Sequence, residues 1–443
     1  MKRSIYISLL VVLFFCFYAL SQAAAQDDQQ PPDANTMFSL SECVAIALNT
    51  SPQILYSQAD ISEKESSLVS SQKDLYPSLF FHYGYQYAPD AAPGAFSTLG
   101  VKDYYSYTFS IEQPIYRGGA LVTGVELGEL QLESSKSAMV QTKSEIILSV
   151  HEAYYNLLKA RKFEEVAEQS LEERKSHLKD ARAYYKAGLI PKNDMLQSEV
   201  QMAGAEIERI RALNLSAMAL ARLNTLLRRP VENEIQVEDI LKYEPSEISF
   251  DLSVKQAKEH RPELKQSEIA IEQADKNITL SRAPYLPAVS ISANYLKQGD
   301  DILAQEYPLG GSSEVKTAMA RLEWRFWAWG QSKNEIAVAK HNLKKAQESE
   351  AELLDNIVLQ VREAYLDIKE FEYNITVTEK AIEQAEEDFR INQSRYQAQL
   401  STSTDVLDAQ TRLTRARINY YNALYNYKIS LMRLSWATGT LVL

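Results

Sequence analysis

Four segments of the chain alternate between apolar and polar residues with a period of two. In "LFFHYGYQY" Leu79, Phe81, Tyr83, Tyr85 and Tyr87 fall on one side of an extended backbone, and in "YSYTFSIE" Tyr105, Tyr107, Phe109 and Ile111 do the same. Such alternation is typical of a β-strand with one apolar face and one polar face. We therefore predict four strands, at residues 78–88, 104–114, 288–297 and 315–326.

The longest segments have the spacing of helices instead. Ile146, Val150, Tyr154 and Leu157 follow each other at intervals of four, four and three residues, which places them along one side of a helix. No proline interrupts residues 119–186. About 65 residues at 1.5 Å each predict a rod of roughly 100 Å.

Shorter helical segments precede and follow each long helix. A helix of about 30 residues is expected from Leu40 to Leu75, with its counterpart at 252–282. After each long helix comes a break, and we expect the next helix to begin at Asp194 or at Asp405. An aspartate at the start of a helix suits its free amides and its dipole.

The second half of the chain repeats the first. Glu-Ala-Tyr at residues 152–154 recurs at 363–365, a spacing of 211, and this spacing holds without a gap from Gly119 to Leu223. Upstream the spacing changes only to 210 and then to 212. Agreement over so long a stretch predicts an internal duplication.

The pattern defines six parts of the chain. These are a signal peptide, an N-terminal linker, a first repeat with its hairpin tip near 187–193, a connecting segment, a second repeat with its tip near 398–404, and a tail. Their predicted bounds are residues 1–25, 26–37, 38–229, 230–249, 250–437 and 438–443.

The N-terminal segment, the net charge and the cysteine content limit the class of protein. Met-Lys-Arg, an apolar run from Ile5 to Leu20 and three alanines at 23–25 are typical of a secretory signal peptide. The formal net charge of −12 argues against a nucleic-acid partner, because nothing offsets the repulsion by phosphates. After cleavage Cys43 is the one cysteine left, so no intrachain disulfide is expected.

Four strands with an aromatic face require a partner. A lipid-facing barrel wall needs alternation over about 10 residues and at least about eight strands. An open sheet edge in lipid would leave backbone groups unpaired, at several kcal/mol each. We therefore predict an α+β membrane protein in which several chains share one outer-membrane β-barrel. The long helical hairpins would form an α-helical barrel continuous with it.

The tip segments "AGLIPKNDML" and "STSTDVLDAQTRL" resemble the periplasmic hairpin tips of the TolC-like outer membrane factors. The duplication, the strand pairs and the hairpins are similar to that family over the whole mature chain. The resemblance implies a homotrimer in outer-membrane lipid, a periplasmic tunnel, and neither catalysis nor a cofactor. It also implies two partners, a periplasmic adaptor (membrane fusion) protein and an inner-membrane transporter. The expected function is the channel of a tripartite efflux pump or a type I secretion system.

Asp405 and Asp408 are candidate gate residues. They lie three residues apart at the start of a helix, and hence on one face. The resemblance implies that three chains supply two rings of carboxylates, which attract cations and raise some of their own pKa values. The alternative from spacing alone is helix capping on a solvated surface.

Other tip residues take roles from the same resemblance. Tyr396 and Asp194 are expected to form a Tyr-to-Asp hydrogen bond that closes the tip. Ser401 occupies the position of an arginine that forms a second tie in the family, so that tie is expected to be missing. The tip residues expected to dock the adaptor are Gly188, Leu189 and Leu400. The alternative is two ordinary turns.

Trp324, Trp327 and Trp329 are predicted to form a membrane-interface belt, the alternative being a packed junction between strand and helix. The five histidines are scattered, no nucleotide or catalytic motif occurs, and neither a metal site nor enzyme activity is expected. The competing hypothesis for the whole protein is an exported coiled-coil scaffold or adhesin.

Overall fold

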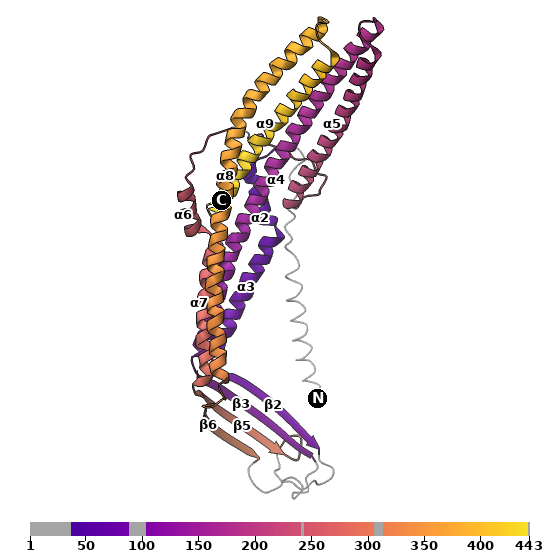
Figure 1. Cartoon of the computed structure of the whole chain (residues 1–443). Helices are drawn as coiled ribbons and strands as arrows, with labels where there is room; N and C mark the ends of the chain where they lie inside the picture. The colour runs from indigo at the N-terminus through magenta and orange to yellow at the C-terminus, as the bar shows by residue number, and fades with distance from the viewer. Residues whose placement is uncertain (1–36, 88–102, 241–242, 305–312, 442–443) are drawn as a thin grey trace, which may run out of the picture.

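The computed structural model describes residues 37–87, 103–240, 243–304 and 313–441. The predicted signal peptide and all but the last residue of the predicted N-terminal linker lie outside the described residues. The protein is a long rod that carries a β-sheet at one end and the tips of two helical hairpins at the other (Figure 1).

Two helices run the length of the rod. Helices α4 (Ala120–Lys186) and α8 (Gln331–Gln397) have 67 residues each, so each is about 100 Å long. Each turns back into a helix of 35 residues, α5 (Lys192–Leu226) or α9 (Ser403–Ala437). The equal lengths in both halves confirm the duplication. The expected starts of α5 and α9 are wrong by two residues, because Asp194 and Asp405 are each the third residue of their helix.

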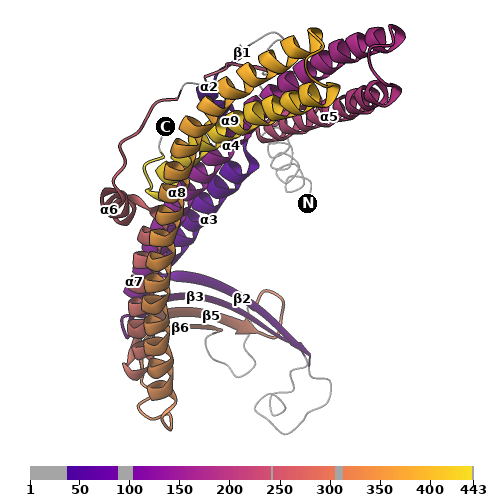
Figure 2. The same cartoon turned by 45° about the horizontal axis from the view of Figure 1, so that its top comes forward.

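The expected 30-residue helices are each broken in two. Helices α2 (Leu40–Thr50) and α3 (Pro52–Lys73) meet at Ser51, and α6 (Phe250–His260) and α7 (Pro262–Arg282) meet at Arg261. Both joining residues are extended, with ψ of 126° and 121°. The cause is the proline that follows, which disfavours helical backbone in the residue before it but suits the first turn of the next helix. Helix α3 then packs along α4, and α7 along both α8 and α4 (Figures 1 and 2).

The sheet has four antiparallel strands in the order β2-β3-β5-β6. Their bounds are β2 (Ser78–Tyr87), β3 (Asp103–Arg117), β5 (Ala288–Gly299) and β6 (Glu314–Glu323). The inner strands β3 and β5 come from different repeats, so the two halves of the chain join at the centre of the sheet. Within the described residues, β2 and β6 each have one edge without a partner strand.

The predicted faces of the first strand pair are correct. Cross-strand aromatic pairs stack along β2 and β3 with ring centroids 4.7, 5.2 and 5.0 Å apart, namely Phe81–Phe109, Tyr83–Tyr107 and Tyr85–Tyr105. Strand β3 runs three residues past the expected end, through an irregularity between Pro114 and Tyr116. Strand β6 ends three residues earlier than expected, at Glu323.

The connecting segment between the repeats is fixed to the middle of the rod. Strands β1 (Met37–Phe38) and β4 (Gln236–Val237) pair in parallel there. The fully buried Tyr154 hydroxyl donates to the carbonyl oxygens of Phe38 (3.2 Å) and Glu238 (2.8 Å). On the second repeat, the Tyr427 hydroxyl donates to the carbonyl of Glu244 (2.9 Å). These bonds satisfy backbone groups that the irregular segment would otherwise bury unpaired.

Left-handed backbone recurs at equivalent positions of the two repeats. Four pairs of residues separated by 211 positions have positive φ: Gly118 and Trp329, Gly119 and Gly330, Gly188 and Gln399, and Arg228 and Gly439. The duplication therefore preserves the turns as well as the helices. Glycine is kept at only some of these positions, so the others carry a conformational cost.

We expect Gln399→Gly to stabilise the protein by about 1 kcal/mol, because Gln399 has a φ of 61°, which glycine adopts without strain. The measurement is the urea midpoint of the purified protein in detergent. Ala398→Gly is the matched control and should destabilise the protein slightly, since the φ of Ala398 is −81°. Equal effects of the two substitutions would show that strain at Gln399 is not the cause.

Candidate gate at the hairpin tips

The two hairpin tips have the same backbone and the same exposed leucine. In the first, the amide of Gly188 donates to the carbonyl of Tyr185 (3.0 Å) and that of Leu189 to Tyr184 (2.9 Å). In the second, the amide of Leu400 donates to the carbonyl of Arg395 (2.7 Å) in the same way. This is the usual ending of a helix whose next residue is left-handed. Leu189 and Leu400 are 52% and 70% exposed, so each tip presents an apolar side chain to solvent.

Asp405 closes a capping box at the start of α9. Its carboxylate accepts hydrogen bonds from the backbone amide (2.9 Å) and the hydroxyl (2.8 Å) of Thr402, and its own amide donates to that hydroxyl (3.3 Å). The Thr402 amide and hydroxyl lower the pKa of Asp405. This direction is opposite to the one expected for a ring of like charges. Asp405 and Asp408 are both exposed, and the ring, which needs three chains, stays a prediction.

The expected hydrogen bond between Tyr396 and Asp194 is wrong for this chain. The Tyr396 hydroxyl is buried, and among the described residues it has no partner in hydrogen-bond geometry. Its ring packs instead against the rings of His177 (4.9 Å between centroids) and Tyr184 (5.5 Å). Burial, and then the charges of Tyr184, Asp180 and Asp194, raise the pKa of Tyr396 to about 12, and the nearby Ser403 side chain opposes this with a smaller lowering, although it is not in hydrogen-bond geometry.

Among the described residues, the Ser401 hydroxyl makes no hydrogen bond to the first hairpin. Its hydroxyl donates to the carbonyl of Asn392 (3.3 Å), which belongs to its own hairpin. The absence of the arginine tie stays a prediction.

A buried chain of polar side chains joins the two hairpins instead. Ser198 of α5 donates to the carbonyl of Asp194 (3.0 Å), and its oxygen lies 3.0 Å from the Ser403 hydroxyl of α9. The Ser403 oxygen lies 2.8 Å from Nε2 of His177 on α4. All three side chains are buried, and with Tyr396 of α8 all four helices contribute to one cluster. Burial lowers the pKa of His177, as does the Arg174 charge, while Asp180 raises it.

Sequence reasoning missed this cluster. His177 and Ser403 are 226 residues apart, and the histidines were considered only as metal ligands. One signal was available, because His177 lies on the side of α4 that also carries the buried residues Leu171, Arg174, Leu178 and Ala181.

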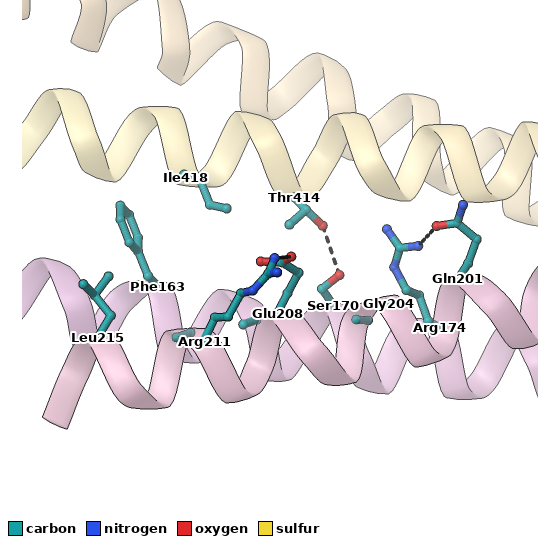
Figure 3. Close-up of a pocket in the computed structure, with 13 residues that line it drawn as sticks. Phe163, Ser170, Arg174, Gln201, Gly204, Glu208, Arg211, Leu215, Thr414 and Ile418 are labelled. Atoms are coloured by element: carbon teal, nitrogen blue, oxygen red, sulfur yellow. Dashed lines mark hydrogen bonds and ion pairs between the residues drawn. The ribbon is translucent and has the colours of Figure 1, made fainter. Parts of the chain in front are cut away.

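Beyond the tips, a cavity of about 450 Å³ lies between α4, α5 and α9 (Figure 3). Phe163, Leu215 and Ile418 line its apolar end. At the polar end the buried Arg174 donates to Gln201 (2.6 Å) on α5 and to Thr411 (3.2 Å) on α9. The bond to Gln201 joins the two arms of the first hairpin, and the bond to Thr411 crosses to the second hairpin.

The three tryptophans follow β6 at the junction between sheet and helices. Trp324, Trp327 and Trp329 are 55%, 65% and 90% exposed. The indole of Trp324 donates to the carbonyl of Tyr285 (2.9 Å), so this residue also helps to fix the junction. The membrane-interface belt stays a prediction.

Neither a membrane-spanning helix nor a cluster of metal ligands occurs among the described residues. No described helix is both long enough and apolar enough to cross a membrane. Nor do the described histidines, cysteines and carboxylates come together in a group of three that could hold a metal ion.

The chain belongs to the outer membrane efflux protein family, which its residues 44–227 and 253–440 match. Each matched range covers one repeat. Among curated proteins, the outer membrane protein TolC of Vibrio cholerae is 22% identical over 91% of both chains. The alkaline protease secretion protein AprF of Pseudomonas aeruginosa is 22% identical over 77% of this chain and 71% of its own length.

Solved structures of the family share the fold. The Campylobacter jejuni CmeC outer membrane channel has a TM-score of 0.80 at 16% identity, covering 90% of this chain and 85% of its own. The outer membrane protein VceC of Vibrio cholerae has a TM-score of 0.79 at 17% identity, covering 90% and 96%. The chain is thus a bacterial outer-membrane channel protein for efflux or type I secretion, with a large periplasmic helical part. Its family is a transport family and not an enzyme family.

Proposed function

We propose that three copies of this chain form a passive export duct across the outer membrane. An inner-membrane transporter would supply the energy and a periplasmic adaptor would join the two. The observation that carries the proposal is the sheet, which has four strands and an edge without a partner strand on each side within the described residues. Four strands cannot close, whereas three copies supply twelve, above the minimum of about eight.

The sheet edges are suited to pairing between copies. All ten residues of β6 and nearly all of β2 are exposed in the single chain. If β6 of one copy pairs with β2 of the next, every edge is used and the backbone groups are satisfied in lipid. The pairing continues the antiparallel order of the sheet.

The helices support the same arrangement. Their contacts give the order α5-α4-α9-α8, with α5 and α8 at the two sides. Both outer helices expose apolar side chains: Leu196, Val200, Ile207 and Ile210 on α5, and Leu359, Leu366, Tyr373 and Val377 on α8. A ring of copies would bury each α5 against the α8 of a neighbour, at about 25 cal/mol per Å² of apolar surface.

The exposed leucines of the tips support an adaptor at the other end. Gly188 lets the first turn place Leu189 at the end of the rod, and Leu400 has the same place in the second tip. The two exposed leucines would offer an adaptor one apolar contact at each tip. The names of relatives cover both protein secretion and efflux pumps, and we propose the shared role of exit duct.

Assembly can be tested at Val200, which is 70% exposed on α5. We expect Val200→Glu to lower the trimer fraction at least tenfold, because it would bury a carboxylate in each interface. Native mass spectrometry of the purified protein in detergent measures this fraction. Val200→Thr keeps the shape and should retain the trimer. A wild-type protein that stays a single chain, and forms no channel in planar bilayers, would contradict the proposed function.

A further inference from the structure

The hydrogens of the polar cluster at the tips can be placed so that both serine hydroxyls have a donor and an acceptor. The Ser198 hydroxyl then donates to the carbonyl of Asp194, the Ser403 hydroxyl donates to Ser198, and Nε2 of His177 donates to Ser403. The Tyr396 hydroxyl lies beside this cluster, buried and without a partner in hydrogen-bond geometry among the described residues.

We propose that His177, Ser403 and Ser198 form a latch that holds the two hairpins together at their tips, and that the latch releases when His177 takes up a second proton. This inference rests on the proposed function, since a latch matters only if the tips open. The name latch is used below for these three residues.

The position of the latch suits this role. Ser403 is the first residue of α9, immediately after the capping residue Thr402. His177 and Ser198 belong to the other hairpin, on α4 and α5. Movement of one tip away from the other must break both contacts of Ser403, so the closed tip is favoured by the net free energy of these two hydrogen bonds.

The surroundings of His177 disfavour a positive charge. Its own helix presents Arg174 one turn before it, with Asp180 as the opposing charge. From α8 the Tyr396 ring covers it, α9 contributes Ser403, and the charge of Asp194 on α5 acts on the adjoining Tyr396. Burial and Arg174 outweigh Asp180, so the pKa of His177 is lowered in the closed tip.

The sign of the pH effect follows. With the tips apart, His177 would be solvated and have an ordinary pKa of about 6.5. Above that pH both states are neutral and the latch is fully effective. Below it the open state binds the proton first, so acid favours opening by up to about tenfold per pH unit for each chain.

The experiment measures conductance of the full-length protein in planar bilayers between pH 7.5 and 5.5. Wild-type conductance should rise as the pH falls below about 6.5. His177→Gln keeps an N–H donor but cannot titrate, so its conductance should stay low across the range. His341→Gln, at an exposed position of α8, is the matched control and should behave as wild type. An acid response of His177→Gln equal to that of wild type would overturn proton control.

Ser403→Ala tests the latch itself. It removes the acceptor of His177 and the donor to Ser198, so the open fraction at pH 7.5 should rise about tenfold. Ser198→Ala removes the hydroxyl that Ser403 contacts on α5 and should also raise the open fraction. If neither variant opens the tip at neutral pH, the latch assignment fails.

A second readout does not depend on conductance. The side chains of Gln197 (α5) and Thr404 (α9) are in contact at 3.2 Å, so cysteines there should be cross-linked by a short thiol reagent when the tip is closed. Burial raises the pKa of the Cys43 thiol to about 11, which keeps it unreactive. Cross-linking should fall with acid in wild type relative to His177→Gln. If no variant conducts but cross-linking shows this difference, the proposed function fails and the latch stands. If no variant conducts and cross-linking shows no such difference, both fail.

Discussion

Replacing Asp405 and Asp408 by alanine is expected to weaken the block of the channel by a trivalent cation about 100-fold. Both carboxylates are exposed on α9 beside the tip, and three chains would present six. Each pair of unit charges at about 4 Å contributes about 1 kcal/mol even in bulk water, and about 1.4 kcal/mol is a factor of ten in affinity. The measurement is the blocking concentration in planar bilayers at fixed salt, because ionic strength screens the effect.

The controls for this prediction separate charge from helix capping. Asp405 also closes the capping box with Thr402, so alanine removes about 1 kcal/mol of helix stability as well. Replacing both residues by asparagine removes the charge and retains an amide oxygen that can cap. It should weaken block as strongly as alanine. Asp355→Ala, at an exposed position of α8 far from the tip in sequence, should leave block unchanged. Unaltered block in the double alanine variant would contradict the carboxylate rings.

Gly118→Ala is expected to destabilise the protein by about 3 kcal/mol and to reduce its assembly into the membrane. Gly118 joins β3 to α4 at a φ of 62°. A Cβ atom there would lie 2.9 Å from the carbonyl carbon and Cα of Ala283, and closer still to its oxygen. The cost combines left-handed backbone, at about 1–2 kcal/mol, with overpacking against a backbone that cannot move aside, at about 1–3 kcal/mol.

The neighbouring glycine provides the control. Gly119 has a φ of 86°, but a Cβ atom there would meet nothing within 4 Å. Gly119→Ala should therefore cost only about 1 kcal/mol, the backbone part alone. Thermal unfolding in detergent and the yield in the membrane fraction compare the two variants. Similar losses for both would show that contact with Ala283 is unimportant.

Much of the fold could be predicted because its patterns are local. Alternation identified the strands, and the apolar side of α4 identified the long helices. The errors lie at the ends of helices and strands, where a few hydrogen bonds determine the last residue of the element. The break before Pro52 was missed because the residues on both sides have a helical pattern. The end of β3 was missed because pairing with β5 resumes at Tyr116 after the irregularity that follows Pro114.

The gate was less predictable, because its contacts join residues far apart in the chain. The acidic pair and the exposed leucines could be placed at the tips from sequence. The partners of Tyr396 could not, since they depend on how the tip end of α4 meets the tip end of α8. The family resemblance predicted a hydrogen bond from Tyr396 to Asp194. In this structure His177 and Tyr184 pack against the Tyr396 ring, and the Ser198 hydroxyl donates to the backbone carbonyl of Asp194.

Each 67-residue helix runs without interruption from the sheet to its tip, past the middle of the rod where Tyr154 and Tyr427 fix the connecting segment. It therefore acts as a lever. A change in tilt of about 5° at the middle, acting over roughly 50 Å of helix, carries the far end about 4 Å sideways. That displacement is larger than the 2.8 Å and 3.0 Å distances between Ser403 and its two partners, so it would break both contacts. A small change in tilt at the middle of the rod is therefore enough to separate the hairpin tips.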